Sequence, residues 1–272
     1  MHSFGLTDEQ RQLQALAHQF SVREIQPVAA HHDREQRMPW EMLHQAFAVG
    51  LVHEIIPEQY GGAGLGFLDS ALVGEELAWG CMGIYSILMA SELGILPIIL
   101  AGSEEQKRRW LPRFSEKLLL ACFSLSEPGS GSDAGSISTF AERQGDEYIV
   151  TGTKCWATNG RVAELRVVFV KTDRKAGTQG ITALVVEGNP PGLDCSKEED
   201  KMGQRAANTA VLVFNRVPIP VANRLGAEGE GFKIAMRTLD KTRINVGAAS
   251  VGLARRALEE CLAYAKQRVQ FG

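Results

Sequence analysis

One stretch near the middle of the chain holds two groups of side chains that suit a phosphate-bearing ligand with a flat ring. The first is a turn of small residues, Glu127 to Asp133. Its backbone N–H groups are able to converge on an anion such as a pyrophosphate. The second places the aromatic face of Trp156 beside the hydroxyl of Thr158, as a polarisable ring with a hydrogen-bonding edge requires. Together they predict a dinucleotide that carries a redox ring.

Three other loop types compete for the same turn. A nucleophile elbow needs Gly-x-Ser-x-Gly and a P-loop needs Gly-x4-Gly-Lys, and this stretch contains neither. The segment Gly129 to Ala134 does match the loose Rossmann fingerprint, which requires a helix directly after the glycines. Residues 135–139 are small and β-branched instead, and the hairpin signal Gln144-Gly145-Asp146 follows. The pattern therefore disfavours a Rossmann NAD site.

Helical periodicity runs through the first part of the chain. Thr7 and Gln10 form a capping box that predicts a helix start. Further helices are expected over residues 39–50, 68–79, 84–100 and 104–114. The apolar run after residue 84 is interrupted by Glu92, Gly94 and Pro97, which favours a buried helix pair over a membrane span. Residues 1–118 are predicted to form an α-helical domain.

The spacing of apolar residues changes twice in the remaining chain. Runs rich in β-branched residues, such as Val167–Val170 and Ile181–Val186, are separated by Gly, Asn and Pro. They predict an antiparallel β sandwich or barrel over residues 119–226. Helical spacing returns over residues 227–272, with Phe232, Met236 and neighbouring apolar residues on one face. The fold class is thus multidomain α+β: an N-terminal α-helical domain, a middle antiparallel β domain and the first helix of a C-terminal bundle.

Composition excludes several classes of function. The formal net charge is −3, from 29 basic and 32 acidic residues, so no basic surface suited to nucleic acid is expected. Five scattered cysteines without a Cys-x-x-Cys pair indicate reduced thiols in a cytosol-like compartment. The histidines lie between His2 and His53, which disfavours a metal site at the central motifs. The chain opens without the pattern of a secretory signal.

The motifs resemble those of one family. Ser-Glu-Pro-Gly-Ser-Gly-Ser-Asp at 126–133 and Gly-Thr-Lys-Cys-Trp-Ala-Thr-Asn-Gly at 152–160 look like the paired motifs of the acyl-CoA dehydrogenases, which are FAD enzymes. Segments 56–64, 102–107 and 239–243 resemble the same family, in the same order. Members are usually longer than 272 residues, so the resemblance implies an acyl-CoA dehydrogenase-like fold with a truncated C-terminal bundle.

The resemblance implies α,β-dehydrogenation of an acyl-CoA thioester, of the short- or medium-chain type. A carboxylate removes the α-proton, and the β-hydrogen leaves as hydride to flavin N5. It also implies an electron-transferring flavoprotein as acceptor and a homo-oligomer, a tetramer in the full-length family. The expected location is the cytoplasm, or the mitochondrial matrix in a eukaryote.

Residue roles follow from the same resemblance. The residues expected to line the isoalloxazine are Phe123, Leu125, Ser126, Trp156 and Thr158. The turn residues Gly131 and Ser132 are expected at the cofactor, and Ser132 also at the CoA moiety. The segment with Arg268, Gln270 and Phe271 is expected to reach the FAD of a neighbouring subunit. Asp240, Thr242 and Arg243 are expected at the substrate, although an exposed ion pair between Asp240 and Arg243 is the simpler alternative.

The catalytic base is expected outside this chain. Some branched- and long-chain members carry a glutamate where this sequence has Thr242, whereas straight-chain members take theirs from a later segment, here beyond Gly272. Two alternatives to a complete dehydrogenase therefore stay open. One is a non-catalytic or split protein that binds flavin or acyl-CoA. The other is an oxidase or monooxygenase of the same fold, which transfers electrons to oxygen.

Overall fold

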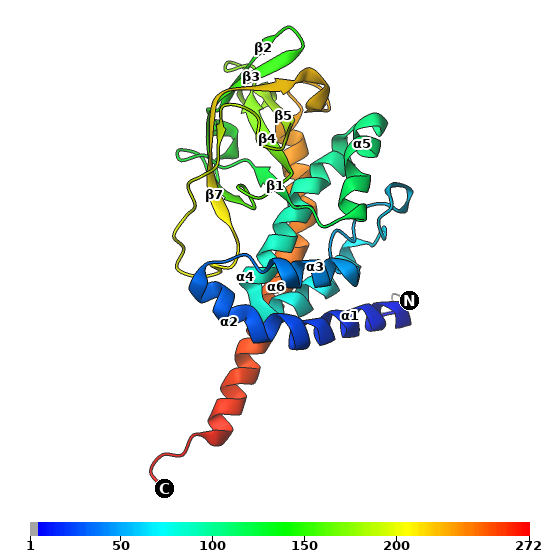
Figure 1. Ribbon diagram of the computed structural model, residues 1–272, viewed down its shortest axis with the longest axis vertical. Helices are drawn as coiled ribbons and strands as arrows, with labels where there is room; N and C mark the ends of the chain where they lie inside the picture. The colour runs from blue at the N-terminus through cyan, green and yellow to red at the C-terminus, as the bar shows by residue number, and fades with distance from the viewer. Residues whose placement is uncertain (1–4) are drawn as a thin grey trace.

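The computed structural model describes residues 5–272 and begins with a group of helices (Figure 1). In chain order these are α1 (Asp8–Phe20), a π-helical turn (Ser21–Ile25), α2 (Gln26–Glu35), α3 (Trp40–Ala48), α4 (Phe67–Ala101) and α5 (Glu104–Glu116). The capping box at the start of α1 forms as predicted, because Gln10 N donates to Thr7 Oγ1 at 3.2 Å and Thr7 N donates to Gln10 Oε1 at 3.1 Å. Ser103 and Gln106 cap α5 in the same way.

Helix α4 consists of two helical halves that meet at Cys81, close to the boundary predicted around residue 80. Cys81 is extended, with φ −166° and ψ 115°, so the chain makes a kink there between the two halves. By length and composition α4 is the one helix among residues 5–272 that could cross a membrane, yet 67% of its most apolar window is buried inside the protein. Its apolar surface is used for packing against neighbouring elements.

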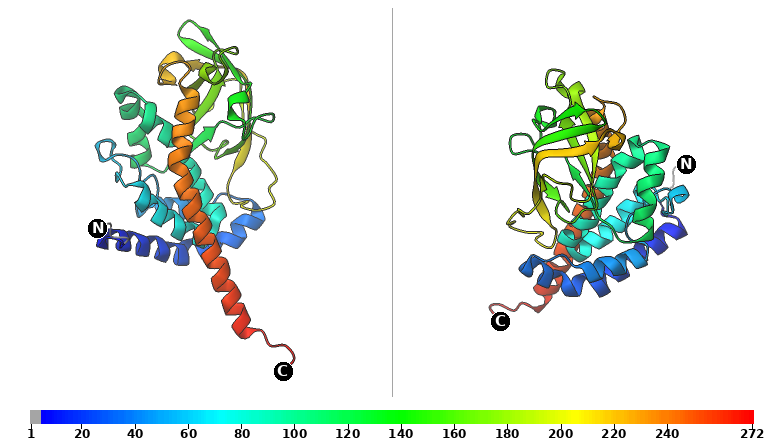
Figure 2. Two further views of the ribbon diagram at one scale, coloured as in Figure 1. Left: turned by 180° about the vertical axis from the view of Figure 1, so that it is seen from behind. Right: turned by 45° about the horizontal axis from the view of Figure 1, so that its top comes forward.

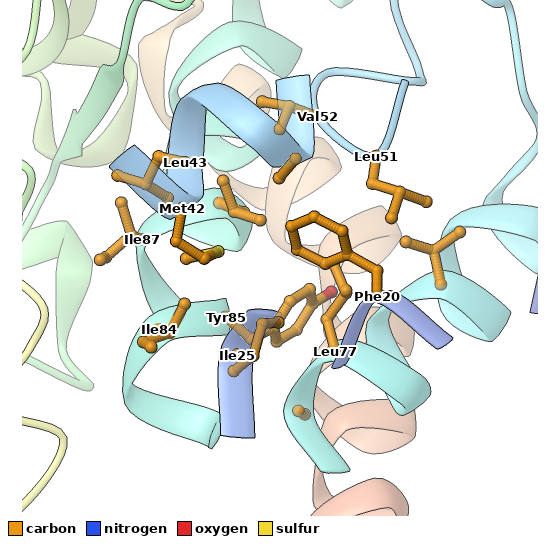
Figure 3. Close-up of a cluster of buried hydrophobic side chains, with 14 of the residues drawn as sticks. Phe20, Ile25, Met42, Leu43, Leu51, Val52, Leu77, Ile84, Tyr85 and Ile87 are labelled. Atoms are coloured by element: carbon orange, nitrogen blue, oxygen red, sulfur yellow. The ribbon is translucent and has the colours of Figure 1, made fainter. Parts of the chain in front are cut away.

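The core of the helical domain lies between α1, α3 and α4. Figure 3 shows the rings of Phe20 and Tyr85 side by side among aliphatic side chains from these helices. Ile25, Leu43 and Ile84 in this cluster are fully buried. This packing explains why short amphipathic helices are stable here, since isolated helices of such length are marginal in water.

The middle part of the chain is a single curled sheet. Its strands are β1 (Ala121–Ser124), β2 (Phe140–Gln144), β3 (Glu147–Thr158), β4 (Leu165–Lys171), β5 (Ile181–Glu187), β6 (Leu193–Asp194), β7 (Thr209–Pro220) and β8 (Arg224–Leu225). The order is β6-β7-β3-β2-β4-β5-β8, with β1 paired to β4. All residues of β4 are buried, because one face packs on α4, α5 and α6 and the other on the inside of the sheet.

The prediction of an antiparallel domain holds for most pairs and is wrong for β1. Strand β1 runs parallel to β4, from the pair Ala121 and Leu165 to the pair Ser124 and Val168, and β2 meets β4 in one parallel bridge. A parallel pair needs a long connection between its strands. The β2–β3 hairpin lies within the β1–β4 connection and supplies it.

The last helix, α6 (Gly231–Gln267), follows α4 and then extends past the rest of the protein (Figure 2). Its buried residues, which include Thr238, Asn245 and Gly252, lie toward α4 and the sheet. Beyond this contact its apolar residues are exposed, and Leu258 is 59% and Leu262 52% accessible. The first half of α6 therefore belongs to the packed structure, and the second half presents an uncovered apolar face.

We expect Gly252→Ala to destabilise the protein, because the added methyl would lie 2.0 Å from the carbonyl oxygen of Glu75 on α4. Forcing α6 away from α4 should cost at least ~1–3 kcal/mol of unfolding free energy. Gly247→Ala is the matched control on the same helix, since its added Cβ meets nothing within 4 Å. That change should be neutral or stabilise by up to about 1 kcal/mol. Urea denaturation of both variants tests this, and equal effects would contradict the close packing.

Candidate functional site

A cavity of about 500 Å³ lies between the sheet and the first turns of α6. The lining residues from the middle domain are Phe123, Leu125, Ser126, Gly131, Ser132, Asp133, Ala134, Gly135, Cys155, Trp156 and Thr178. Those from α6 are Phe232, Met236 and Leu239. The two central sequence motifs thus meet at one hollow, with an apolar helix face opposite them.

The small-residue turn after β1 is closed by its own backbone. Glu127 and Ser130 exchange N–H···O bonds of 2.9 and 3.0 Å, and Ser130 Oγ donates to the Asp133 carbonyl at 2.5 Å. A three-residue 3-10 turn, Ala134–Ser136, follows in place of a helix, in line with the rejection of a Rossmann site. Gly131 and Ser132 lie exposed at the rim of the cavity.

Trp156 is held at the outer edge of this cavity by an irregularity in β3. The β3–β7 register shifts between Lys154 and Ala157, and Trp156 adopts the left-handed region with φ +57°. A bulky residue in this region is strained, and such strain is concentrated at functional sites. The ring remains 62% accessible. The bulge therefore turns a large aromatic surface toward the cavity instead of into the core.

The two motifs are joined by direct contacts. Cys155 N donates to the Ser126 carbonyl oxygen at 3.0 Å, which places Trp156 close to Ser126. At the inner end of the cavity the Phe123 ring packs on the buried Phe169, with ring centroids 4.8 Å apart. Two aromatic rings and the Ser126 hydroxyl therefore stand around the same space. Within residues 5–272 the hydroxyls of Ser126 and Ser132 make no hydrogen bond, so both are free to contact a ligand.

A buried ion pair lies behind this wall. Lys154 Nζ donates to Glu127 Oε1 at 2.8 Å, and the two side chains are 0% and 3% accessible. Burial lowers the pKa of Lys154 to about 8, although the Glu127 carboxylate opposes the shift. Burial also disfavours the charge on Glu127, but the Lys154 ammonium and the hydrogen bonds from residues 138 and 139 outweigh it and lower the pKa of Glu127 to about 2. Both groups are therefore charged at neutral pH.

Several residues expected at the site are not brought to this cavity. Thr158 pairs with Thr209 at the end of β3 and does not line it. Arg268, Gln270 and Phe271 follow the end of α6 and are exposed at the protruding terminus (Figure 2). At 1.5 Å per residue they lie roughly 45 Å along the helix from the cavity, so they cannot reach it within one chain. Their contact with a neighbouring subunit stays a prediction.

The three residues of the next turn of α6 also lie outside the lining. Asp240 and Arg243 form an exposed ion pair, with Arg243 donating to Asp240 at 2.7 Å. Thr242 is buried, and its hydroxyl donates to the Thr238 carbonyl. Leu239, immediately before them, does line the cavity. The turn thus borders the site, and direct contact of these residues with a substrate stays a prediction.

Sequence reasoning missed most of the α6 wall. Phe232, Met236 and Leu239 were recognised as one apolar helix face but were assigned to bundle packing. Their spacing of four and three residues is the signal for a shared face, yet it does not tell a cavity wall from a core contact. Thr178, which precedes β5, had no sequence signal at all.

A second hollow, of about 400 Å³, lies between the α2–α3 turn and residues 198–209. Three of its charged side chains are already paired: Arg161 donates to Glu198 at 2.6 Å, and Arg205 binds Asp33. None of the residues expected at the cofactor or the substrate lines it. The cavity beside Trp156 is therefore the better candidate for chemistry.

The residues around that cavity fit a flavin. A flat ring needs aromatic and aliphatic faces with a few hydrogen-bonding groups at its edge, and Trp156, Phe123 and Ser126 supply these. The exposed Gly131 leaves the turn open, because a Cβ there would meet nothing within 4 Å. A helical domain, a curled sheet and a covering helix around such a site define a flavin-dependent oxidoreductase.

Comparison with known proteins agrees with this class. Family models of the acyl-CoA dehydrogenase N-terminal, middle and C-terminal domains match residues 7–117, 122–217 and 229–272. A probable medium-chain specific acyl-CoA dehydrogenase of Caenorhabditis briggsae is 39% identical over 99% of this chain and 67% of its own. The structure of butyryl-CoA dehydrogenase from Megasphaera elsdenii has a TM-score of 0.95 and 39% identity, over 100% of this chain and 72% of that one. That of the prolyl acyl carrier protein oxidase AnaB has a TM-score of 0.93 and 32% identity, covering 98% and 72%.

The chain belongs to the acyl-CoA dehydrogenase family, a family of flavoproteins and oxidoreductases. It spans about two thirds of the length of its curated relatives, 67% in the nematode protein. The predicted order of a helical domain, a β domain and the start of a C-terminal helical domain is confirmed by these matches.

We expect Glu127→Gln to destabilise the protein by ~3–5 kcal/mol at pH 7, because it leaves the Lys154 ammonium buried without its partner. The Glu127 carboxylate has a pKa of about 2 in the fold against an ordinary value of 4.5. Its stabilising effect is thus complete above pH 4.5 and is lost as the pH falls through about 2. The gap between variant and wild type should shrink over that interval, as measured by denaturant unfolding. The exposed Glu142→Gln is the control, and a gap independent of pH would contradict the assignment.

Proposed function

We propose that this protein is an FAD-dependent dehydrogenase of straight-chain, short or medium acyl-CoA thioesters. The single observation that supports this best is that Ser126 and Trp156 line one cavity. They belong to distant segments of the chain: Leu125 and Lys154, which are joined by a hydrogen bond behind the cavity wall, are 29 positions apart. Membership of the acyl-CoA dehydrogenase family supplies the reaction class.

The proposed roles follow from the positions of the side chains. Phe123, Leu125 and Trp156 would hold the isoalloxazine between apolar surfaces, and the Ser126 hydroxyl would donate a hydrogen bond to its edge. Bound FAD would accept the hydride that leaves the β-carbon. Phe232 and Met236 of α6 would exclude water from the opposite side, which strengthens the hydrogen bonds made inside.

The CoA moiety and the catalytic base are assigned less directly. Gly131 and Ser132 at the open turn would contact the pyrophosphate or the pantetheine, and Asp240 with Arg243 would lie along the CoA chain at the cavity border. Thr242 cannot act as a base, since its hydroxyl already donates within α6. We propose that the α-proton is removed by a carboxylate that residues 5–272 do not provide.

Partners and location are proposed from the same site and surface. An electron-transferring flavoprotein would accept the electrons, and the exposed edge of Trp156 offers it access to the ring. The uncovered residues of α6, including Val251 at 55% and Tyr264 at 63% accessible, favour a homo-oligomer, with a tetramer as the family arrangement. Arg268, Gln270 and Phe271 would then contact the FAD of a neighbouring subunit. The protein would work in the cytoplasm, or in the matrix of a mitochondrion.

A flavin oxidase is the second candidate, favoured by the structural similarity to the AnaB oxidase. The two candidates differ in how the reduced flavin reacts with oxygen. Rapid reoxidation by air after photoreduction would favour the oxidase, and slow reoxidation the dehydrogenase.

We expect the purified protein to bind FAD with quenching of the flavin fluorescence, and butyryl-CoA or octanoyl-CoA to perturb the visible spectrum of the bound flavin. These changes require both ligands to meet at one cavity. Absence of FAD binding would refute the proposed function. Fast turnover of either substrate with an artificial electron acceptor would instead contradict only the claim that the base lies outside residues 5–272.

Trp156→Ala should weaken FAD binding about tenfold, because stacking on an aromatic face contributes ~0.5–1.5 kcal/mol beyond buried area. Fluorescence titration measures the change. Trp40→Ala is the matched control, since Trp40 is also partly exposed, at 39%, and does not line the cavity. Equal affinity in the wild type and Trp156→Ala would show that the flavin lies elsewhere.

A further inference from the structure

The buried pair Lys154–Glu127 occupies a special place relative to the cavity. Glu127 directly follows Ser126, and Lys154 directly precedes Cys155, and both of these neighbours line the cavity. Yet neither charged side chain lines it itself, since both are enclosed behind the wall. The pair is therefore the layer that supports the wall from the protein side.

The two side chains of the pair form hydrogen bonds with different parts of the protein. Lys154 Nζ also donates to the Leu125 carbonyl oxygen at 3.0 Å, and Leu125 is a wall residue. The Glu127 carboxylate accepts from Ser138 N at 2.6 Å, Ser138 Oγ at 2.7 Å and Thr139 N at 3.0 Å. Ser138 and Thr139 do not line the cavity. Lys154 thus bonds a wall residue directly, whereas the donors to the Glu127 carboxylate, other than Lys154, come from residues outside the wall.

Stability alone does not explain this pair. A buried ion pair gains little net free energy, because desolvation of both charges offsets their attraction, and apolar replacements are often neutral or stabilising. In a low-dielectric interior, however, an oriented pair acts over longer distances than it would in water. A reducible ring in the cavity would sense the ammonium end more strongly than the carboxylate end.

We propose that Lys154, anchored by Glu127, is a positioning residue for the flavin of this site. It fixes the Leu125–Ser126 wall against which the ring lies, and it presents a positive end that favours the reduced, more negative flavin. This inference rests on the proposed function, since it concerns the same cavity, and it assigns a role to a residue that contacts neither substrate nor cofactor.

The test is the double variant Glu127→Leu/Lys154→Met, which removes both charges and leaves none unpaired. It should be less stable than the wild type, because the N–H groups of Ser138 and Thr139 and the Leu125 carbonyl lose their partners. The potential is therefore measured at a temperature at which urea denaturation shows the variant to be folded. FAD binding should weaken about tenfold, and the preference for reduced over oxidised flavin should fall about tenfold. For a two-electron couple this lowers the reduction potential by about 30 mV. A dye-equilibration titration of the flavin-loaded protein measures the potential.

Two further variants keep the outcome decisive. Lys201→Met is the matched control, because Lys201 is a half-buried lysine of the same domain that donates to the carbonyls of Gln204 and Ala207 and does not line the cavity. Its potential should equal that of the wild type. Lys154→Arg keeps the positive charge and should also keep the reduction potential of the flavin. It tests the role of the charge if the double variant does not fold.

The measurements distinguish a failure of this inference from a failure of the proposed function. A wild type that does not bind FAD refutes the proposed function. A wild type that binds FAD, with an unchanged potential and affinity in the double variant, refutes only the role of Lys154. A potential that shifts equally in Lys154→Arg would also overturn the inference, because the charge would then not be the cause.

Discussion

The site depends on the contact between the turn after β1 and the bulged end of β3. These two segments are distant in sequence, and only a few bonds join them: Lys154 to Glu127, Lys154 to the Leu125 carbonyl, and Cys155 N to the Ser126 carbonyl. The ion pair costs desolvation, so the geometry of its hydrogen bonds decides whether it is tolerated. Glu127 meets this condition with four donors at 2.6 to 3.0 Å. Without this contact, Trp156 and Ser126 would belong to separate surfaces.

The helix α6 serves this site in a second way. Its first turns form the apolar wall opposite the motifs, and the next turns pack on α4 so closely that Gly252 leaves no space for a side chain. Asn245 of α6 donates to Ser70 and to the buried Glu92 of α4. Burial and the neighbouring Glu54 raise the pKa of Glu92 well above its ordinary value, which favours the neutral form of this carboxyl in the interface. The position of the cavity wall is thus fixed by packing that lies outside the cavity.

Local signals determined the elements of the fold. The capping boxes at Thr7 and Ser103 set helix starts, and the β-branched run of β4 indicated a strand, which the structure shows to be fully buried. The kink in α4 lies near the predicted break around residue 80: Cys81 leaves helical geometry, and the two halves on either side of it pack on the same core. The parallel pairing of β1 had no local signal, since strand partners are chosen by long-range contacts.

For the site, the sequence by itself determined which residue types belong together. The small turn and the tryptophan strand each have a composition that suits one part of a dinucleotide, and their joint spacing resembles a single family. The tertiary structure alone decided which of them share a cavity. Trp156 lines the cavity because its backbone is left-handed, a conformation that no sequence pattern predicts. Thr158 lies outside the cavity, whereas Phe232, Met236 and Leu239 of α6 line it. The physical reason is that side-chain direction depends on bulges and packing between distant segments, whereas spacing along the chain reports only local geometry.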